Sequence, residues 1–102
     1  MFLYDSHGTA IAHRRSVEDR WLWDTHGRWI GWFPWIDSDA YSKDGTYLAS
    51  VVGNRLLRRT NQPYRGYPGY PGYPGYAGYP GYGGHAGYVS MPSGFRDLDL
   101  AT

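Results

Sequence analysis

Short apolar runs alternate with polar, glycine-containing segments over roughly the first sixty residues of the chain. Examples of these runs are Trp21–Trp23, Trp29–Trp32 and Tyr47–Val52. Their aromatic, β-branched and small side chains suit the pleated, half-buried surface of a sheet. No segment there keeps the spacing of three and four residues that is typical of an amphipathic helix. The pattern predicts an all-β domain, a meander of about seven or eight short antiparallel strands within residues 1–60.

A ten-residue motif occurs twice in full and a third time in a weaker form. Its copies are Leu3–Ala12, Leu22–Gly31 and Ala40–Ala49. Gly27 lies 19 residues after Gly8, and Gly45 lies 18 residues after Gly27. A unit this short cannot bury its own apolar face, so the copies must pack together. The sequence therefore predicts a small, shallow barrel built from repeated antiparallel hairpins.

Each copy contains the residues of a three-residue hairpin turn. A short oxygen-bearing side chain, such as Asp5 in the first copy and Asp24 in the second, precedes the glycine by three residues. Such a side chain accepts hydrogen bonds from backbone N–H groups of a type I turn, and the glycine then takes a left-handed conformation that strains other residues. We therefore assign structural roles in the turns to Asp5, Gly8, Asp24, Gly27 and Gly45.

Composition and charge exclude several kinds of functional site. The chain has 102 residues, a formal net charge of +1 and no cysteine. Disulfides, thiolate metal sites and cysteine nucleophiles are thereby excluded, and no global field favours nucleic acid. Neither a signal peptide nor a transmembrane segment is visible, so we predict a cytoplasmic protein that can associate with a membrane. All five Trp lie between positions 21 and 35, and their apolar area would help to stabilise so small a domain.

The composition changes after a first domain that comprises residues 1–62. Residues 63–88 consist largely of Gly-Tyr-Pro triplets, which predict a disordered, low-complexity tail. The tail could be a flexible tether or a tyrosine-rich interaction segment, and it suits a collagen-like triple helix less well. Residues 89–102 regain apolar side chains and could return to the barrel as a strand or short helix, or bind a partner. We favour their return because an incomplete last repeat leaves an apolar edge open.

The second copy of the motif carries a resemblance to a known family. Residues Trp23–Trp32 read Trp-Asp-Thr-His-Gly-Arg-Trp-Ile-Gly-Trp, and the repeated motif followed by a Gly/Pro/Tyr-rich tail resembles the bacterial four-fold beta flower proteins. The resemblance covers residues 2–52 well and 53–62 more weakly. The third copy differs in having Ser42 and Asp44 where the others have Asp and His, and a fourth copy is barely legible. The resemblance implies a pseudo-four-fold barrel of hairpin petals, distantly similar to tubby-like and scramblase-like barrels, close to a membrane and without enzymatic activity.

Histidines in the turns are the nearest approach to a catalytic or metal site. His7 follows Asp5 by two residues, and His26 follows Asp24 in the same way. A rotation that relates the repeats could gather these groups, but a metal site needs three or four ligands with an oriented second shell. Asp and a polar neighbour are also ordinary residues in hairpin turns. We favour the turn interpretation, predict neither a catalytic site nor a cofactor, and keep His7 and His26 as the candidates for metal binding.

Basic and aromatic residues form the candidate contact surface. They are Arg14, Arg15, Trp32, Phe33, Trp35, Arg58 and Arg59. Arginine and aromatic side chains together suit an anionic membrane surface. In the alternative interpretation the rings belong to the core and nearby acidic residues neutralise the arginines. Those acidic residues are Glu18, Asp19, Asp37 and Asp39.

These observations lead us to predict a non-enzymatic binding module, with the barrel as a rigid platform and the tail as a flexible arm. The preferred partner is an anionic membrane surface. One alternative is a scaffold whose tyrosine-rich tail drives self-association or recruits protein partners without lipid. Another is a protein that binds a metal or small ligand through the Asp-x-His-Gly loops. Binding of nucleic acid is disfavoured by the low net charge, and a homo-oligomer is compatible with the sequence.

Overall fold

The structure is a computed structural model that describes residues 1–16, 18–61, 65, 66, 68, 69, 81 and 83–98. Within these residues every regular element is a strand. The strands are β1 (Phe2–Tyr4), β2 (Ala10–His13), β3 (Trp21–Asp24), β4 (Trp29–Trp32), β5 (Asp39–Tyr41), β6 (Tyr47–Val52), β7 (Arg55–Arg59) and β8 (Phe95–Asp97). Seven of them lie within residues 1–60. The prediction of an all-β domain is confirmed for the described residues.

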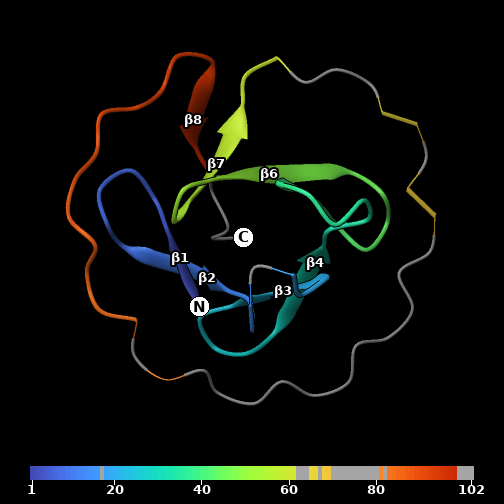
Figure 1. Ribbon diagram of the computed structural model, residues 1–102, viewed down its shortest axis with the longest axis horizontal. Coiled ribbons are helices and arrows are strands. Elements are labelled where there is room, and N and C mark those ends of the chain that lie inside the picture. Colours follow the sequence, from blue (N-terminus) through green and yellow to red (C-terminus); the bar gives the residue numbers. More distant parts are fainter. Residues whose placement is uncertain (17, 62–64, 67, 70–80, 82, 99–102) are drawn as a thin grey trace.

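Strands β1 to β7 form a closed barrel in chain order (Figure 1). Each of these strands pairs antiparallel with the next. The barrel closes through a parallel pairing of β1 with β7, in which Tyr4 lies opposite Arg55 and the Tyr4 N–H donates to the Asn54 carbonyl oxygen at 3.0 Å. The sequence pattern predicted antiparallel pairs only. An odd number of strands in a meander leaves the first and last strands pointing the same way, so this one pairing is parallel.

The hairpin turns share one geometry. Asp5 Oδ1 accepts hydrogen bonds from the N–H groups of His7 and Thr9, both at 2.9 Å, and Asp24 makes the equivalent pair in the second turn. In the third turn the Ser42 hydroxyl contacts Asp44 and accepts a hydrogen bond from the N–H of Thr46, just before β6, instead. The turn glycines have φ angles in the left-handed region that the motif predicts: 90° for Gly8, 85° for Gly27 and 92° for Gly45.

The strand register also slips at the same point of each motif copy. The slips fall between Leu3 and Tyr4, between Leu22 and Trp23, and between Ala40 and Tyr41. An extra residue in one strand of a pair bends that strand and increases its twist. Three equivalent bulges therefore help to curl so short a sheet into a closed barrel.

The barrel interior is filled by side chains from equivalent positions of the motif copies. The inner cluster consists of Leu3, Ala12, Leu22, Phe33, Ala40, Ala49 and Leu56, all fully buried. Three of these hold the first position of a copy and two hold the last, where the second copy has Gly31. A Cβ on Gly31 would lie 2.6 Å from the carbonyl oxygen of Tyr41. The last position of the motif must therefore stay small for the strands to approach one another.

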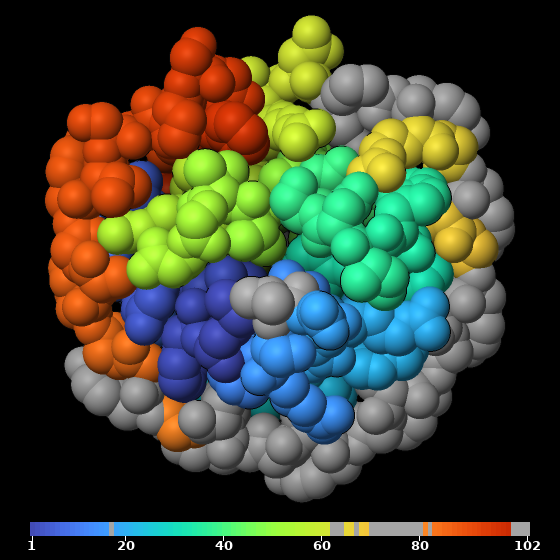
Figure 2. Space-filling view, in the orientation of Figure 1, coloured from blue at the N-terminus to red at the C-terminus, as the bar shows by residue number. Residues whose placement is uncertain are grey.

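The described chain after residue 82 lies against the barrel. This C-terminal arm, residues 83–98, runs beside the first hairpin and ends in β8, which pairs antiparallel with β7 (Figures 1 and 2). The Tyr4 hydroxyl donates to the Gly83 carbonyl oxygen at 2.7 Å, and the Ala86 N–H donates to the Gly8 carbonyl oxygen at 2.9 Å. Of the arrangements that the sequence left open for the last segment, the structure has a strand that returns to the barrel.

Two polar side chains fasten the C-terminal arm. Arg55, only 7% exposed, donates through Nη1 to the carbonyl oxygen of Gly87 at 2.7 Å and through Nη2 to that of Ala86 at 3.2 Å. Asp97 accepts hydrogen bonds from the N–H and the hydroxyl of Ser6, at 2.8 and 2.7 Å. Residues 83–88 belong to the segment that composition predicts to be disordered. They are docked because backbone carbonyl groups, which composition does not reveal, bind Arg55; residues 70–80 of that segment lie outside the described residues.

Candidate binding surface

Four tryptophans lie on the outward face of the β3–β4 hairpin. Leu22 points into the inner cluster, so its neighbours Trp21 and Trp23 point outward. The strand register places Trp32 opposite Trp21 and Trp29 opposite Trp23, on the same face. The rings of Trp21 and Trp29 pack edge to face with their centroids 5.8 Å apart. Trp21 and Trp29 are half-buried, whereas Trp23 and Trp32 are only 1% and 2% exposed, so the first two rings are the ones that reach the surface of the hairpin.

Three exposed cations lie over these rings. The Arg20 guanidinium is 5.3 Å from the centroid of the Trp21 ring, and the Lys43 ammonium is 5.2 Å from that of Trp29. Arg15 lies 5.3 Å from the ring of Trp23. These distances are within the range of cation–π attraction, and none of the three cations forms an ion pair with a described carboxylate. We call Arg15, Arg20, Trp21, Trp29 and Lys43 the cation–tryptophan surface; the Trp23 ring beneath Arg15 is itself buried, 1% exposed.

Three of the residues predicted to contact a partner are buried instead. Phe33 is fully buried, Trp32 is 2% exposed and Arg14 is 3% exposed. The Arg14 guanidinium lies 3.9 Å from the centroid of the Phe33 ring and donates through Nη2 to the Asp19 carbonyl oxygen at 2.6 Å. Burial lowers the pKa of Arg14 from its usual value, against the opposing charge of Asp19. These side chains are covered by their neighbours, Trp32 by Tyr41 and Tyr47 on the outward side of the sheet, so the expected contact surface does not include them.

The other predicted contact residues bind neighbouring groups of the protein. Arg58 donates through Nη1 to the carbonyl oxygens of Tyr47 and Leu48, at 3.2 and 3.1 Å. The Trp35 ring is covered by the Arg65 guanidinium, 4.1 Å from its centroid. Of the seven residues predicted from sequence, only Arg15 is exposed and over a tryptophan without a described ion pair. Arg20 and Lys43 were missed, although both adjoin a predicted strand or turn and Arg20 immediately precedes Trp21.

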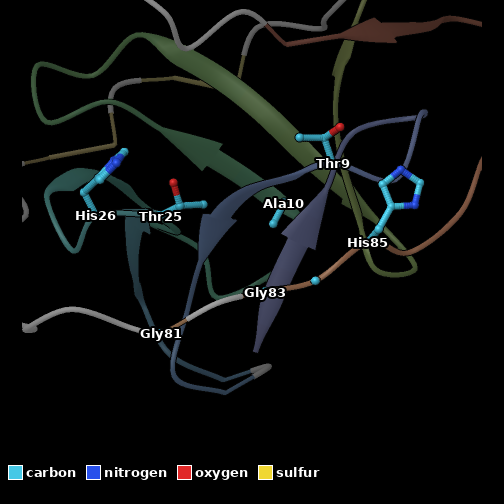
Figure 3. A pocket seen from close by; sticks show the side chains of 8 residues that line it. Thr9, Ala10, Thr25, His26, Gly81, Gly83 and His85 are labelled. Atoms are coloured by element: carbon cyan, nitrogen blue, oxygen red, sulfur yellow. The ribbon is translucent and has the colours of Figure 1, made fainter.

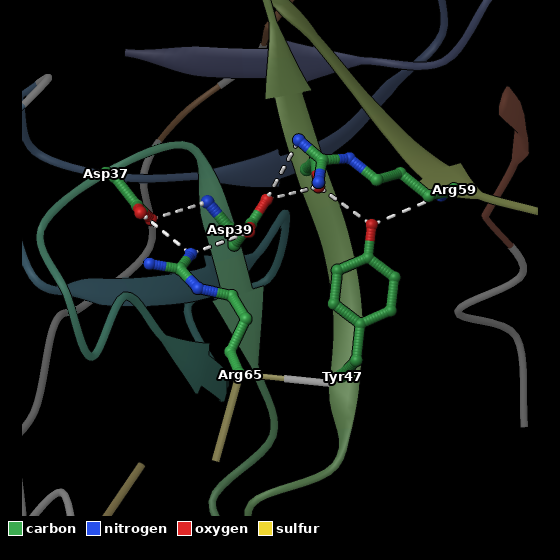
Figure 4. Close-up of polar contacts among 6 residues, drawn as sticks. Asp37, Asp39, Tyr47, Arg59 and Arg65 are labelled. Atoms are coloured by element: carbon green, nitrogen blue, oxygen red, sulfur yellow. Dashed lines mark hydrogen bonds and ion pairs between the residues drawn. The ribbon is translucent and has the colours of Figure 1, made fainter. Parts of the chain in front are cut away.

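Charged and hydroxyl side chains of β5, β6 and β7, together with Arg65, form a polar cluster in which the charged groups bind one another (Figure 4). Asp39, 3% exposed, accepts from the Ser50 hydroxyl at 2.7 Å and from Arg65 Nη1 at 2.7 Å, and Arg59 Nη2 lies 3.5 Å away. The Tyr47 hydroxyl contacts that of Ser50 at 2.7 Å and accepts from the Arg59 N–H at 3.1 Å. Every member has a partner, so the cluster fixes the barrel edge and holds Arg65 rather than presenting a free charge.

Asp37 joins the same cluster through Arg65, at 2.8 Å. Partial burial alone would raise the pKa of the Asp37 carboxyl. The hydrogen bonds from the Asp39 N–H and from Arg65 outweigh this effect, so its pKa lies below the usual value. The hydrogen bond to Asp37 in turn raises the pKa of Arg65. This pair keeps its charges throughout the neutral range.

The turn histidines are not brought together. His26 lines a pocket of about 310 Å³, together with Thr9, Ala10, Thr25, Gly81, Gly83, Gly84 and His85 (Figure 3). In that view His26 and His85 stand on opposite sides of the pocket. His7 instead lies beside Tyr88 and has its Nδ1 3.6 Å from Asp97. Within the described part of the chain, no three or more His, Asp or Glu side chains are placed to hold a metal ion together.

Ser6, His7 and Asp97 form the one described group that has the residue types of a catalytic triad. The Ser6 hydroxyl bonds to the Asp97 carboxylate and not to the imidazole of His7. A serine nucleophile requires the imidazole as its base, so this arrangement does not activate the hydroxyl. Burial would raise the pKa of Asp97, but the two bonds from Ser6 and the charge of His7 hold it below its usual value. The group fastens the C-terminal arm.

Comparison with known proteins identifies no relative: no family, no curated protein and no solved structure matches the chain. Among the described residues no helix has the length and apolar character needed to cross a bilayer. The function must therefore be argued from the surface itself.

Proposed function

We propose that the protein is a non-enzymatic binding module whose cation–tryptophan surface attaches to an anionic membrane surface. The observation that carries this proposal is that Arg15, Arg20 and Lys43 are exposed, lie over tryptophan rings, and form no ion pair with a described carboxylate. Tryptophan rings suit the headgroup region of a bilayer, and nearby cations are attracted by anionic headgroups. The surface thus combines both kinds of side chain that an interfacial site needs.

The fold proposed with this function is a barrel of the beta flower type. Its support is the common turn geometry and the common bulge position of the three motif copies. The resemblance of the sequence to beta flower proteins, with their distant likeness to scramblase-like barrels, agrees with a place close to a membrane.

Co-sedimentation with vesicles tests the proposal. Wild-type protein should pellet with phosphatidylserine-containing vesicles at low salt, less so at physiological salt, and not with neutral phosphatidylcholine vesicles. Each Lys or Arg near an anionic surface contributes about 1 kcal/mol, so the double variant Arg20→Gln plus Lys43→Gln should bind roughly 30-fold more weakly.

A charge-matched variant provides the control for this experiment. Arg28→Gln plus Arg96→Gln also removes two exposed positive charges, but Arg28 pairs with Asp24 at 2.8 Å and Arg96 lies on β8. This control should lose less than about threefold in affinity if the cations of the proposed surface are the ones that bind. Equal losses in the two double variants would contradict the assignment of the surface, and absence of pelleting at any salt would contradict membrane binding.

A second candidate function is binding of a small ligand in the pocket between the first two hairpins and the C-terminal arm. The observation in its favour is a pocket of about 310 Å³ that two imidazoles, His26 and His85, and two threonines line from different sides. Zn²⁺ or Cu²⁺, which imidazole binds well, would then raise the melting temperature of the wild type and of His7→Ala but not of His26→Ala. Self-association through the tyrosine-rich tail remains the alternative if neither test succeeds.

A further inference from the structure

We propose that the surface that receives the C-terminal arm is also a docking site for the arm of a second copy of this chain. We call this surface the arm site; it consists of Tyr4, Ser6, Gly8, Thr9 and Arg55, all from the first hairpin or β7. This inference does not depend on membrane binding, because none of these residues belongs to the cation–tryptophan surface.

The arm site is built for an extended, glycine-rich segment. Arg55 is more than nine-tenths buried and directs its Nη1 and Nη2 at two successive carbonyl oxygens, those of Gly87 and Ala86. Gly8 allows the close approach, since a Cβ there would lie 2.5 Å from both the N and the O of Gly87. A short antiparallel bridge between Thr9 and His85 continues the contact. Such main-chain recognition is the mode by which sheet proteins bind extended peptides.

The arm reaches this site from far along the chain. Residues 66–82, 17 residues of mostly Gly-Tyr-Pro composition, separate Arg65, which is held by Asp37 and Asp39, from Gly83 at the start of the arm. Seventeen residues can span at most about 56–61 Å when fully extended. The molecule measures 35 × 33 × 26 Å, so the arm of one copy can reach the site of an adjacent copy. Docking within one chain competes at an effective concentration in the millimolar range.

A mixture of two variants tests docking of one copy's arm on another copy, because neither variant can dock its own arm in its own site. Arg55→Ala removes the donors of the arm site but leaves a competent arm, whereas Ala86→Pro removes the N–H that binds Gly8 and leaves a competent site. Each variant alone should sediment as a monomer of 11.6 kDa. Their equimolar mixture should form a 1:1 dimer of twice that mass, because only the unlike pair combines a working arm with a working site.

The matched control is Arg55→Ala mixed with Ser90→Pro. The Ser90 N–H has no hydrogen bond partner in the described structure, so this second variant keeps its own arm in its own site and the mixture should stay monomeric. A mixture of Arg55→Ala with Ala86→Pro that stays monomeric while both variants are folded by circular dichroism would overturn the proposal.

If the two variants do not fold, resonance energy transfer between labelled copies that keep Arg55 and Ala86 tests the same proposal. The chain has no cysteine, so a donor can be attached at Ser93→Cys on the arm of one batch and an acceptor at Ser38→Cys on the barrel of another. Transfer should rise as the mixture approaches a concentration of about one millimolar. It should be lost when the acceptor batch also carries Arg55→Ala plus Ala86→Pro, which disable both its arm site and its arm. Absence of transfer with the wild-type acceptor, or transfer that persists with the double variant, overturns arm exchange; persistence would point to association through the tyrosine-rich tail.

Discussion

Replacement of Gly8 by alanine separates the cost of the turn from the cost of releasing the C-terminal arm. Gly8 has a φ of 90°, and a Cβ there would lie 2.5 Å from the backbone of Gly87. Gly53 has a φ of 65°, and a Cβ there would meet no atom within 4 Å. Alanine at either position carries the strain of a left-handed backbone, about 1–2 kcal/mol. Only Gly8→Ala must also displace residues 85–87.

The size of the additional loss follows from the bonds that the displaced segment makes. The hydrogen bond from Ala86 N–H to Gly8 and the two bonds from Arg55 to the arm carbonyl groups would be broken. Counting about 1 kcal/mol for each after the groups are rehydrated, Gly8→Ala should cost about 3 kcal/mol more than Gly53→Ala. With a denaturant slope of about 1–1.5 kcal/mol per molar for so small a domain, the urea midpoint should fall about 2–3 M further.

Two measurements check this expectation. Urea unfolding followed by tryptophan fluorescence gives the difference between the two variants, and hydrogen exchange of the Ala86 amide reports directly on the arm. Gly8→Ala should lose protection at Ala86 and Gly53→Ala should keep it. Equal urea midpoints together with unchanged protection at Ala86 would refute the reasoning, because the arm would then not depend on the close approach at Gly8.

Three further predictions concern the core, the polar cluster and pH. Leu22→Ala should lower the free energy of unfolding by about 2–5 kcal/mol in a urea titration, since its side chain is fully buried. Tyr47→Phe should cost about 1–2 kcal/mol because it leaves the Arg59 N–H without its acceptor, whereas Tyr88→Phe, 70% exposed, should change stability by less than about 0.5 kcal/mol. The pKa of Asp97 is lower in the folded than in the unfolded protein. The ionised carboxylate therefore stabilises the fold above the unfolded-state pKa, and this contribution is lost as the pH falls through the folded-state pKa. In urea titrations below about pH 4, the wild type should thus lose more stability than Asp97→Asn.

Features that depend on neighbouring residues in the chain could be predicted from the sequence. The spacing of Asp5 from Gly8, and of Asp24 from Gly27, specifies a turn whose hydrogen bonds and φ angles are all local. The apolar runs between the turns give the number of strands for the same reason. Even the inner cluster follows the motif, since equivalent positions of the copies enter the barrel together.

Features that depend on closure of the barrel could not be predicted in this way. Arg14 and Arg15 are adjacent in sequence, yet one is buried against Phe33 and the other lies exposed over Trp23. Both residues follow the end of β2 at His13, so strand alternation does not distinguish them. The difference depends on Phe33 and Trp23, which only the folded chain brings beside them. The role of Arg55 depends on a carbonyl group 32 residues further along the chain. No pattern within β7 signals that partner.

The position of Arg55 has a consequence for how the chain reaches its folded state. The residue forms the closing pair with Tyr4, and the same side chain binds both the Asp5 carbonyl oxygen, 50 residues earlier, and the arm. The arm site is therefore complete only after the two ends of the barrel have met. During synthesis the barrel cannot close until β7 has emerged, and the arm, which follows β7 in the chain, then meets a surface that did not exist before. We therefore expect the arm to dock after the barrel has closed, and to slow reopening of the barrel through the bonds that Arg55 makes to both.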